Sequence, residues 1–174
     1  MRETRVMDIR EKQGRSGPLV FVVVRHEISN MSGLAITEEH DIVYRDHGPA
    51  APAQLARADA AWERTIQPDD VLLFRYSALT FNGHRIHYDR RYATEVERYP
   101  GLVVHGPLIA TLLMDLLRRQ QPAADVARFS FRAVSPLFDT EPFTVCGKAE
   151  DRAISLWARD PAGNLAMSAE ALLR

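Results

Sequence analysis

Apolar residues along this chain recur mostly at the two-residue spacing of β-strands, and one long segment shows helical spacing instead. The 19–28 run Leu-Val-Phe-Val-Val-Val-Arg-His-Glu-Ile has the β-branched composition of a buried strand. The same criteria predict further strands over residues 3–13, 34–44, 71–79, 128–134, 142–148, 153–158 and 165–173. The pattern therefore indicates a protein built mainly from antiparallel sheet.

Residues 106–120 are the segment with helical spacing. Pro107 stands in the first turn, where its missing N–H costs nothing, and Arg118 and Arg119 lie at the carboxyl end, where positive charge is favourable. Apolar side chains recur three and four residues apart at Leu108, Ile109, Leu112, Leu113, Leu116 and Leu117. This content predicts a helix that is covered on more than one side.

Turn and linker compositions divide the chain into three parts. We expect an N-terminal β module over residues 1–47, a Pro- and Ala-rich linker over 48–64, and a domain over 65–174 in which one helix is wrapped by a curved antiparallel sheet, an α+β fold. The smaller predictions are turns at 14–18, 30–33 and 160–163, a helical turn at 59–62, a break at 68–70, and short helical turns within 89–99.

Composition narrows the function classes. A net charge of -1 over 174 residues provides no field that would hold nucleic acid. The single cysteine, Cys146, excludes a disulfide within the chain. No apolar run reaches the length of a membrane span, and residues 1–18 lack the apolar stretch of a signal peptide. We therefore expect a cytoplasmic protein with no nucleic-acid or membrane partner.

Two short segments carry the residues suited to acid–base chemistry on a carbonyl compound. The first, Asn-Gly-His-Arg-Ile-His, covers residues 82–87 and includes an imidazole that titrates near neutral pH. The second is the Gly106-Pro107 start of the helix, where a free backbone N–H at the positive end of the helix dipole suits a developing oxyanion. Taken singly, each segment also fits an ordinary turn or an ordinary helix start.

A metal site built from His84, His87 and His105 is not favoured, because no carboxylate or thiolate completes it at a recognisable spacing. We expect neither a metal nor another cofactor.

Together the two segments resemble the MaoC-like (R)-specific enoyl-thioester hydratase and dehydratase family, which has a hotdog fold. The family pattern Ser-Gly-Asp-x-Asn-Pro-Ile-His aligns with residues 80–87, Thr-Phe-Asn-Gly-His-Arg-Ile-His. His87 then matches the catalytic histidine, and Gly106 matches the oxyanion-hole glycine. Asn82 replaces the catalytic aspartate, His84 the asparagine and Arg85 the proline of that pattern.

The full segments 75–89 and 99–107 are similar to one branch of this family, which contains mesaconyl-C4-CoA and itaconyl-CoA hydratases and the mitochondrial type 2 hydroxyacyl-thioester dehydratase. Members of that branch carry two hotdog modules. Residues 3–46 resemble the last strands of the first module, which predicts a partial, helix-less β module ahead of the complete hotdog domain.

The resemblance, together with the chemistry of the side chains, suggests roles for six residues of the two segments. His87, Asn82 and Gly106 are expected to be catalytic: His87 as the base, Asn82 as a holder of water, and Gly106 as the oxyanion donor. His84, Arg85 and His105 are expected to bind the substrate, with Arg85 recognising a carboxylate. The alternatives are that Asp89 or Glu95 assists His87, and that Arg85 simply pairs with Asp89 at the surface.

The leading functional hypothesis is a hydro-lyase acting on a C4–C5 dicarboxylic or branched enoyl-CoA thioester, with no cofactor. The first alternative is a 3-hydroxyacyl-thioester dehydratase of fatty-acid synthesis. The second is a non-catalytic or truncated hotdog subunit that binds acyl-CoA or a partner chain. Because exposed strand edges and apolar surface favour self-association, we expect a homodimer or a larger homo-oligomer.

Overall fold

The structure is a computed structural model that describes residues 1–14, 17–45, 52–151 and 153–174. The chain forms two compact units, Met1–Pro52 and Ala53–Arg174. Residues 48–51 of the expected linker lie outside the described residues, as do residues 15 and 16 of the first predicted turn. Each unit is described below by itself.

The first unit is a three-stranded antiparallel meander in the order β1-β2-β3, as the alternation predicts. Its strands are β1 (Arg2–Gly14), β2 (Gly17–Asn30) and β3 (Gly33–Arg45). The turn between β2 and β3 depends on Gly33, whose φ of 111° is unfavourable for any other residue. The Asn30 side chain closes this turn by accepting a hydrogen bond from the Ser32 N–H at 2.8 Å.

The middle strand of this unit is less buried than its composition predicts. Most side chains of β2 are half-buried, and His26, which is 7% exposed, is the one residue of this strand in the buried class. The reason is that the described part of the unit contains strands alone, and a three-stranded sheet cannot enclose both of its own faces.

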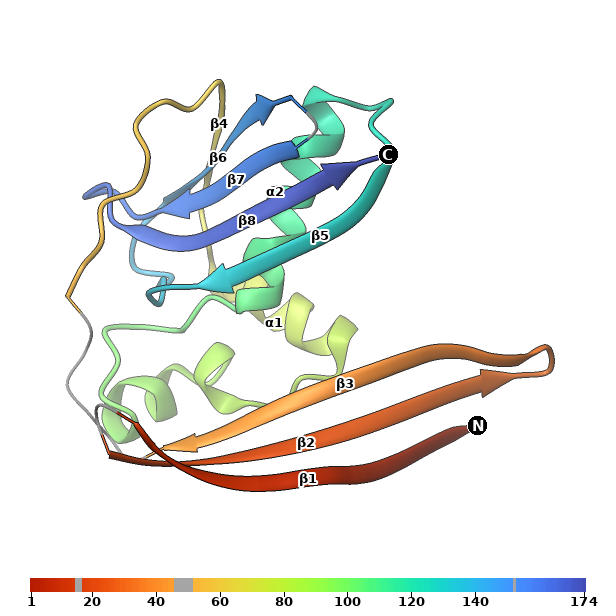
Figure 1. The fold of residues 1–174 in the computed structure, drawn as a ribbon. Helices are drawn as coiled ribbons and strands as arrows, with labels where there is room; N and C mark the ends of the chain where they lie inside the picture. Colours follow the sequence, from red (N-terminus) through yellow and green to blue (C-terminus); the bar gives the residue numbers. More distant parts are fainter. Residues whose placement is uncertain (15–16, 46–51, 152) are drawn as a thin grey trace. The chain divides into compact units, whose positions relative to one another are not determined.

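The second unit contains a five-stranded antiparallel sheet with the helix α2 (Gly106–Gln120) packed on it (Figure 1). The strand order is β4-β6-β7-β8-β5. The strands are β4 (Trp62–Ile66), β5 (Val126–Ala133), β6 (Phe143–Glu150), β7 (Ala153–Arg159) and β8 (Leu165–Leu173). A long helix packed on an antiparallel sheet is the hotdog arrangement, as predicted.

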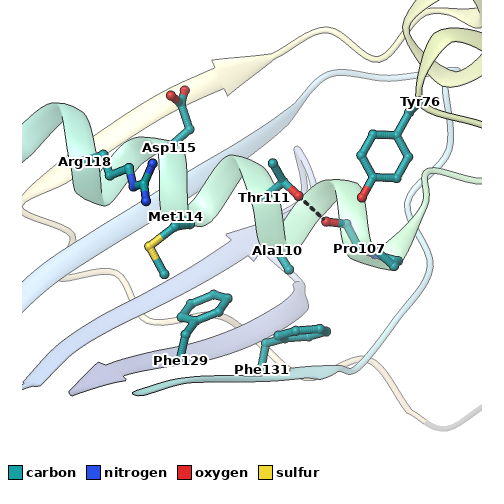
Figure 2. A pocket seen from close by; sticks show the side chains of 9 residues that line it. All are labelled: Tyr76, Pro107, Ala110, Thr111, Met114, Asp115, Arg118, Phe129 and Phe131. Atoms are coloured by element: carbon teal, nitrogen blue, oxygen red, sulfur yellow. Dashed lines mark hydrogen bonds between the residues drawn. The ribbon is translucent and has the colours of Figure 1, made fainter. Parts of the chain in front are cut away.

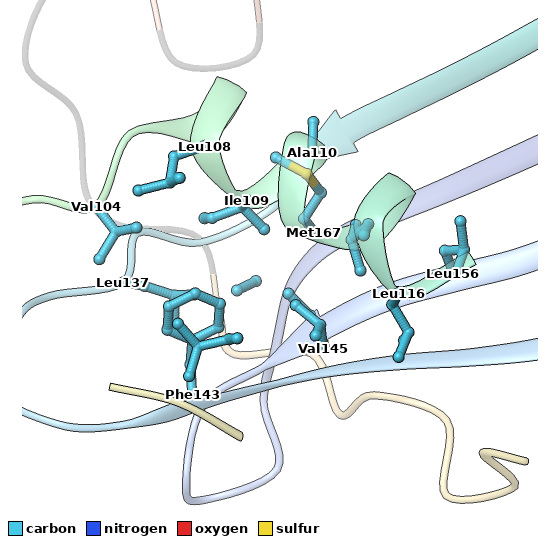
Figure 3. Close-up of a cluster of buried hydrophobic side chains, with 14 of the residues drawn as sticks. Val104, Leu108, Ile109, Ala110, Leu116, Leu137, Phe143, Val145, Leu156 and Met167 are labelled. Carbon is cyan, nitrogen blue, oxygen red and sulfur yellow. The ribbon is translucent and has the colours of Figure 1, made fainter. Parts of the chain in front are cut away.

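Helix α2 has the predicted bounds and supplies much of the core of this unit. Leu113 and Leu117 have no exposed surface, and Leu116 is 1% exposed. Figure 3 shows this face of α2 in contact with side chains of the sheet, among them Val145, Leu156 and Met167. Because its apolar face is buried along its whole length, the amino-terminal end of α2 is held in a fixed place.

Two local predictions are wrong. Residues predicted as the strand 71–79 form the helix α1 (Asp70–Thr80), in which the Asp69 side chain caps the Leu72 N–H at 2.7 Å. A short run that is apolar on all sides has no periodicity that separates a helix from a strand, and here the N-terminal cap decides.

The predicted helical turn at 59–62 is replaced by strand β4, which begins at Trp62 inside the expected linker. The Trp62 ring packs against Gly147 of β6, where an added Cβ would lie 2.9 Å from a ring atom. This contact between residues far apart in the chain fixes the register of β4 on the sheet.

Two short helices connect α1 to α2. They are the 3₁₀ turn η1 (Arg85–His87), which lies in the segment predicted as a polar turn, and the π-helix η2 (Tyr92–Val96), within the region 89–99 where short helical turns were predicted. Helix α1 ends at Thr80 and is capped by Phe81, a residue in the left-handed conformation with φ of 53°. Among the described residues, no helix is both long enough and apolar enough to cross a membrane.

Candidate active site

One cavity brings together the predicted base and the predicted oxyanion donor. It has a volume of about 340 Å³ and lies where η1, the start of α2 and the loop after β5 meet. His87 and Gly106 both line it, together with the mainly apolar residues Val103, Val104, Ile109, Ala133, Val134, Ser135, Pro136, Leu137, Ala166 and Met167. Among these residues, His87 is the one titratable side chain.

The backbone at residue 103 fixes the tautomer of His87. The Nδ1 of His87 lies 2.7 Å from the Val103 carbonyl oxygen, which accepts hydrogen bonds and cannot donate one. Nδ1 therefore carries the proton and Nε2 carries the lone pair. The Val103 N–H in turn donates to the Ile86 carbonyl at 3.0 Å, so the two segments hold each other from both sides.

Burial makes this imidazole a neutral base. His87 is 8% exposed, and desolvation lowers its pKa below the ordinary value of 6.5. The hydrogen bond to Val103 opposes this shift, and the nearby His84 adds to it. At neutral pH, Nε2 is therefore free to accept a proton.

Neither close packing nor an unusual backbone conformation requires a glycine at position 106. A Cβ added there would meet a single atom within 4 Å, Met167 Cε at 3.9 Å, which is an ordinary contact. By contrast, Gly101 and Gly147 are required by packing, because a Cβ would come within 2.5 Å of Asp139 and 2.9 Å of Leu156. Gly106 lines the cavity, and because it has no side chain a ligand there can approach its backbone closely.

As the first residue of α2, Gly106 has an N–H without an acceptor inside the helix. This donor lies at the positive end of the helix dipole. The cavity thus combines a neutral imidazole with a backbone donor suited to negative charge on a carbonyl oxygen.

His105 is not placed where the sequence suggested. Its side chain has no exposed surface and stacks on the ring of His87, with the ring centroids 3.8 Å apart. The Ser77 hydroxyl lies 2.8 Å from its Nε2. A fully enclosed ring cannot contact a substrate directly, so this arrangement argues against the predicted substrate-binding role of His105.

The structure does not bring Asn82 into the His87 cavity. Asn82 lines a neighbouring hollow of about 290 Å³ with residues of α1, and its side-chain oxygen accepts the His84 N–H at 3.0 Å. The amide therefore shapes the turn that leads to η1. The His84 residue is exposed, and its ring lies edge-on to His87 with centroids 5.6 Å apart.

Arg85 adopts the surface pairing that the sequence left open. Its Nη2 lies 2.7 Å from Asp89 Oδ2, and its guanidinium stacks over the Tyr92 ring at 4.1 Å. The other carboxylate considered, Glu95, pairs with Arg91 at 2.8 Å. Both carboxylates are thus held in exposed ion pairs, and among the residues that line the cavity His87 is the one side chain that could act as a base.

Sequence reasoning missed two groups that help to build the site, the Ser77 side chain and the Val103 carbonyl. Ser77 comes from α1 and is buried, and the Val103 carbonyl orients His87. A small polar residue within an apolar segment would have pointed to Ser77 if residues 71–79 had been assigned to a helix. The backbone acceptor has no sequence signal, since every residue carries one.

Within the described ranges, no group of three His, Cys, Asp or Glu side chains is placed to hold a metal ion.

The helix packed on an antiparallel sheet, with a cavity at its amino-terminal end, places the chain among hotdog-fold proteins. The hydroxyacyl-thioester dehydratase type 2 family matches residues 1–139, which include both segments of the site, and the chain belongs to this family.

Curated relatives fall within the same group. The chain is 50% identical over 172 residues to a mesaconyl-C(4)-CoA hydratase of Chloroflexus aurantiacus, a match that covers 97% of this chain and 61% of the relative. It is 35% identical over 132 residues to the mitochondrial hydroxyacyl-thioester dehydratase type 2 of Schizosaccharomyces pombe, covering 72% of this chain and 43% of the relative. The chain thus spans about three fifths of the first relative and less than half of the second.

Solved structures show the same fold at low sequence identity. HtdX from Mycobacterium tuberculosis is 19% identical with a TM-score of 0.70, over 98% of this chain and 67% of that chain. An (R)-hydratase from A. caviae is 22% identical with a TM-score of 0.56, over 68% of this chain and 98% of that chain.

Proposed function

We propose that this chain adds water to, or removes it from, the α,β double bond of an acyl-CoA thioester. The observation that carries the proposal is that the neutral base His87 and the free N–H of Gly106 line one cavity. The 50% identity to a mesaconyl-C(4)-CoA hydratase supports a C4–C5 dicarboxylic enoyl-CoA as the substrate.

In the hydration direction, His87 Nε2 takes a proton from water while the water oxygen bonds to the β-carbon. The π electrons move through the α-carbon onto the thioester oxygen, where the Gly106 N–H and the dipole of α2 stabilise the negative charge. The enolate then collapses, and the imidazolium returns its proton to the α-carbon. One base serves both steps, so the mechanism requires no carboxylate in the position of Asn82.

Arg85 supports recognition of a distal carboxylate. Asp89 is bound by Nε and Nη2 of the guanidinium, which leaves the Nη1 donors for another partner. With the exposed His84 ring on the same turn, this edge of the site carries donors suited to an anionic acyl group.

A second candidate is dehydration of 3-hydroxyacyl thioesters with longer apolar chains. The mainly apolar lining of the His87 cavity favours it, and so does the similarity to the Schizosaccharomyces pombe dehydratase. The two candidates share the base and the oxyanion donor and differ in the acyl group.

A turnover assay with the full chain tests the proposal. Mesaconyl-C4-CoA, itaconyl-CoA and crotonyl-CoA are supplied in turn, and loss of the enoyl absorbance is followed. We expect the two dicarboxylic thioesters to react faster than crotonyl-CoA. Faster turnover of long-chain 3-hydroxyacyl thioesters would instead favour the second candidate. A sample that is folded by circular dichroism and transforms none of these compounds would contradict both.

We also propose that the chain self-associates through the outer strand β5. A hollow of about 540 Å³ lies between α2 and this strand, and Figure 2 shows the Phe129 and Phe131 rings beneath the helix there. Phe131 is 51% exposed, and β5 has one neighbour, β8, within the described sheet. A second copy of the chain would cover both the strand edge and these rings. Light scattering at micromolar concentration should give a dimer or larger species, and a monomer would refute this.

A further inference from the structure

Three side chains from three different elements form one stack behind the base. Ser77 comes from α1, His105 is the residue that precedes α2, and His87 ends η1. The Ser77 hydroxyl is 2.8 Å from His105 Nε2, and the His105 and His87 rings lie 3.8 Å apart at an interplanar angle of 16°. The rear face of the base is therefore covered by another flat ring.

The supporting ring is held in an uncharged state. His105 has no exposed surface, and its Nδ1 has no hydrogen-bond partner among the described residues. Burial lowers the pKa of His105 to about 4, and the neighbouring His87 contributes to this shift. If His105 were protonated, its positive charge would lie directly against the His87 ring. Burial keeps His105 neutral near neutral pH and so prevents this.

His105 also connects the base to the oxyanion donor through its own backbone. It is the N-cap residue of α2, and its carbonyl accepts the Ile109 N–H at 3.1 Å. The next residue along the chain is Gly106. The ring plane of His87 and the position of the Gly106 N–H are therefore both set by one residue, which the buried helix holds in place.

We propose that the buried Ser77–His105 pair is a positioning device that fixes the ring plane of His87 relative to the Gly106 N–H. Ser77 prevents rotation of the His105 ring, and the His105 ring prevents tilting of His87. The catalytic consequence of this positioning rests on the proposed function. The orientation of the His87 ring does not, because it can be measured without any substrate.

The other groups around the stack do not supply this support. His84 meets His87 edge-on rather than face to face, and Tyr76 meets the His105 ring edge-on with centroids 4.9 Å apart. The Arg85–Asp89 pair lies on the exposed side of the same turn. The Val103 carbonyl holds His87 at one atom on the edge of the ring, whereas the His105 ring lies against its face, so the two contacts restrain different motions of the imidazole.

The test combines NMR of the histidine side chains with steady-state kinetics on the full chain. His105→Ala removes the stacking ring, whereas His105→Phe keeps a flat ring that needs no bond from Ser77. In the His105→Ala variant we expect water to reach His87, its titration midpoint to rise toward 6.5, and its proton to exchange between the two nitrogens. Because misplacing a reacting group costs up to about 10²-fold, kcat should fall between about 10- and 100-fold with a smaller change in KM.

His105→Phe should keep the low titration midpoint, the Nδ1-protonated tautomer and kcat within about threefold of wild type. Ser77→Ala should lower kcat several-fold in the wild-type background and have no effect in the His105→Phe background. This non-additivity is the mark of two residues acting as one unit.

The first unit offers a matched control. His26 is also buried, and a hydroxyl, Thr4 Oγ1, lies 2.8 Å from its Nδ1. His26→Phe and Thr4→Val should leave kcat and the His87 signals unchanged.

Distinct outcomes separate this inference from the proposed function. The inference is overturned if His105→Ala leaves the tautomer, the midpoint and kcat as in wild type. It is also overturned if His105→Phe lowers kcat as much as His105→Ala does. A third contradicting result would be a Ser77→Ala substitution that lowers kcat by the same factor in the His105→Phe background as in wild type. The His105→Ala variant can show the expected change in the titration midpoint and tautomer of His87 even if the wild-type chain turns over no enoyl thioester. In that case the proposed function fails and the positioning role stands.

Discussion

Both units of this protein contain an antiparallel sheet, yet among the described residues a buried apolar cluster and a candidate active site are found in the second unit. In Met1–Pro52, exposed apolar side chains such as Ile9, Val6 and Ile36 are between 55% and 64% exposed. In Ala53–Arg174, helix α2 covers the sheet and gives a cluster of fully buried side chains. The difference is a helix that removes one face of the sheet from water.

The same helix explains why the chemistry belongs to the second unit. A strand uses its N–H groups in pairing, whereas the first turn of a helix leaves N–H donors free. Each unit also buries one histidine beside a hydroxyl group, His26 near Thr4 and His105 near Ser77. Of these two, His105 stacks on another imidazole and precedes a free helix N-terminus, so the surroundings and not the residue type give it a role.

The largest expected effect of a single change is at the base. His87→Gln should lower kcat/KM for an enoyl-CoA by about 10³-fold or more, because one group carries both proton transfers. His26→Gln, in the other unit, is the matched change and should leave the rate within about twofold. Equal losses in the two variants would break the contrast between the units.

The cores should differ in their response to truncation. Leu113→Ala should lower the free energy of unfolding by about 3 kcal/mol, because Leu113 is completely buried on the sheet. Val22→Ala, at a half-buried position of β2, should cost about 1 kcal/mol or less. Urea titrations of both variants measure these values, and similar costs would show that the first unit has a core of its own.

Filling the space beside Gly106 should separate catalysis from stability. Gly106→Ala should lower kcat by about 10²-fold, because the added methyl group occupies the cavity where the thioester oxygen would lie. Thermal unfolding should be unchanged or slightly higher in temperature, since the Cβ meets only Met167 Cε at an ordinary distance and alanine favours the helix. A variant with full activity would remove Gly106 from the mechanism.

Acid should destabilise the second unit through His105. Its pKa is about 4 in the folded chain and 6.5 when unfolded, so between these values the unfolded chain binds more protons. The contribution of neutral His105 to the free energy of unfolding is therefore fully present above pH 6.5 and is lost as the pH decreases. We expect the free energy of unfolding to fall by about 2 kcal/mol between pH 7.5 and 5. Urea unfolding at the two pH values measures the difference, and His105→Phe should reduce it. An unchanged pH response in that variant would assign the acid sensitivity elsewhere.

The smallest effect is expected at Arg85. Because the Arg85–Asp89 pair is exposed, Arg85→Ala should leave the melting temperature unchanged within error. If Nη1 binds the distal carboxylate, KM for mesaconyl-C4-CoA should rise about tenfold while KM for crotonyl-CoA stays the same. Equal changes for both thioesters would rule out this selective role.

Sequence reasoning predicted the regular parts of the fold and was weakest where the chain is apolar without periodicity. The alternating strands and the amphipathic helix α2 are present with bounds close to those predicted. Helix α1 was assigned to a strand, and β4 was assigned to a helical turn and linker. In both places a specific contact decides the structure: the Asp69 cap in α1 and the packing of Trp62 on Gly147 in β4.

The sequence alone determined which residue types were available for chemistry: an imidazole in a polar turn and a Gly-Pro helix start. Only the tertiary structure decided which of them meet. It placed His87 and Gly106 in one cavity, turned Asn82 into a neighbouring hollow and enclosed His105 behind the base. The physical reason is that burial, tautomer and ring stacking depend on contacts between segments distant in the chain, and local spacing carries no record of those contacts.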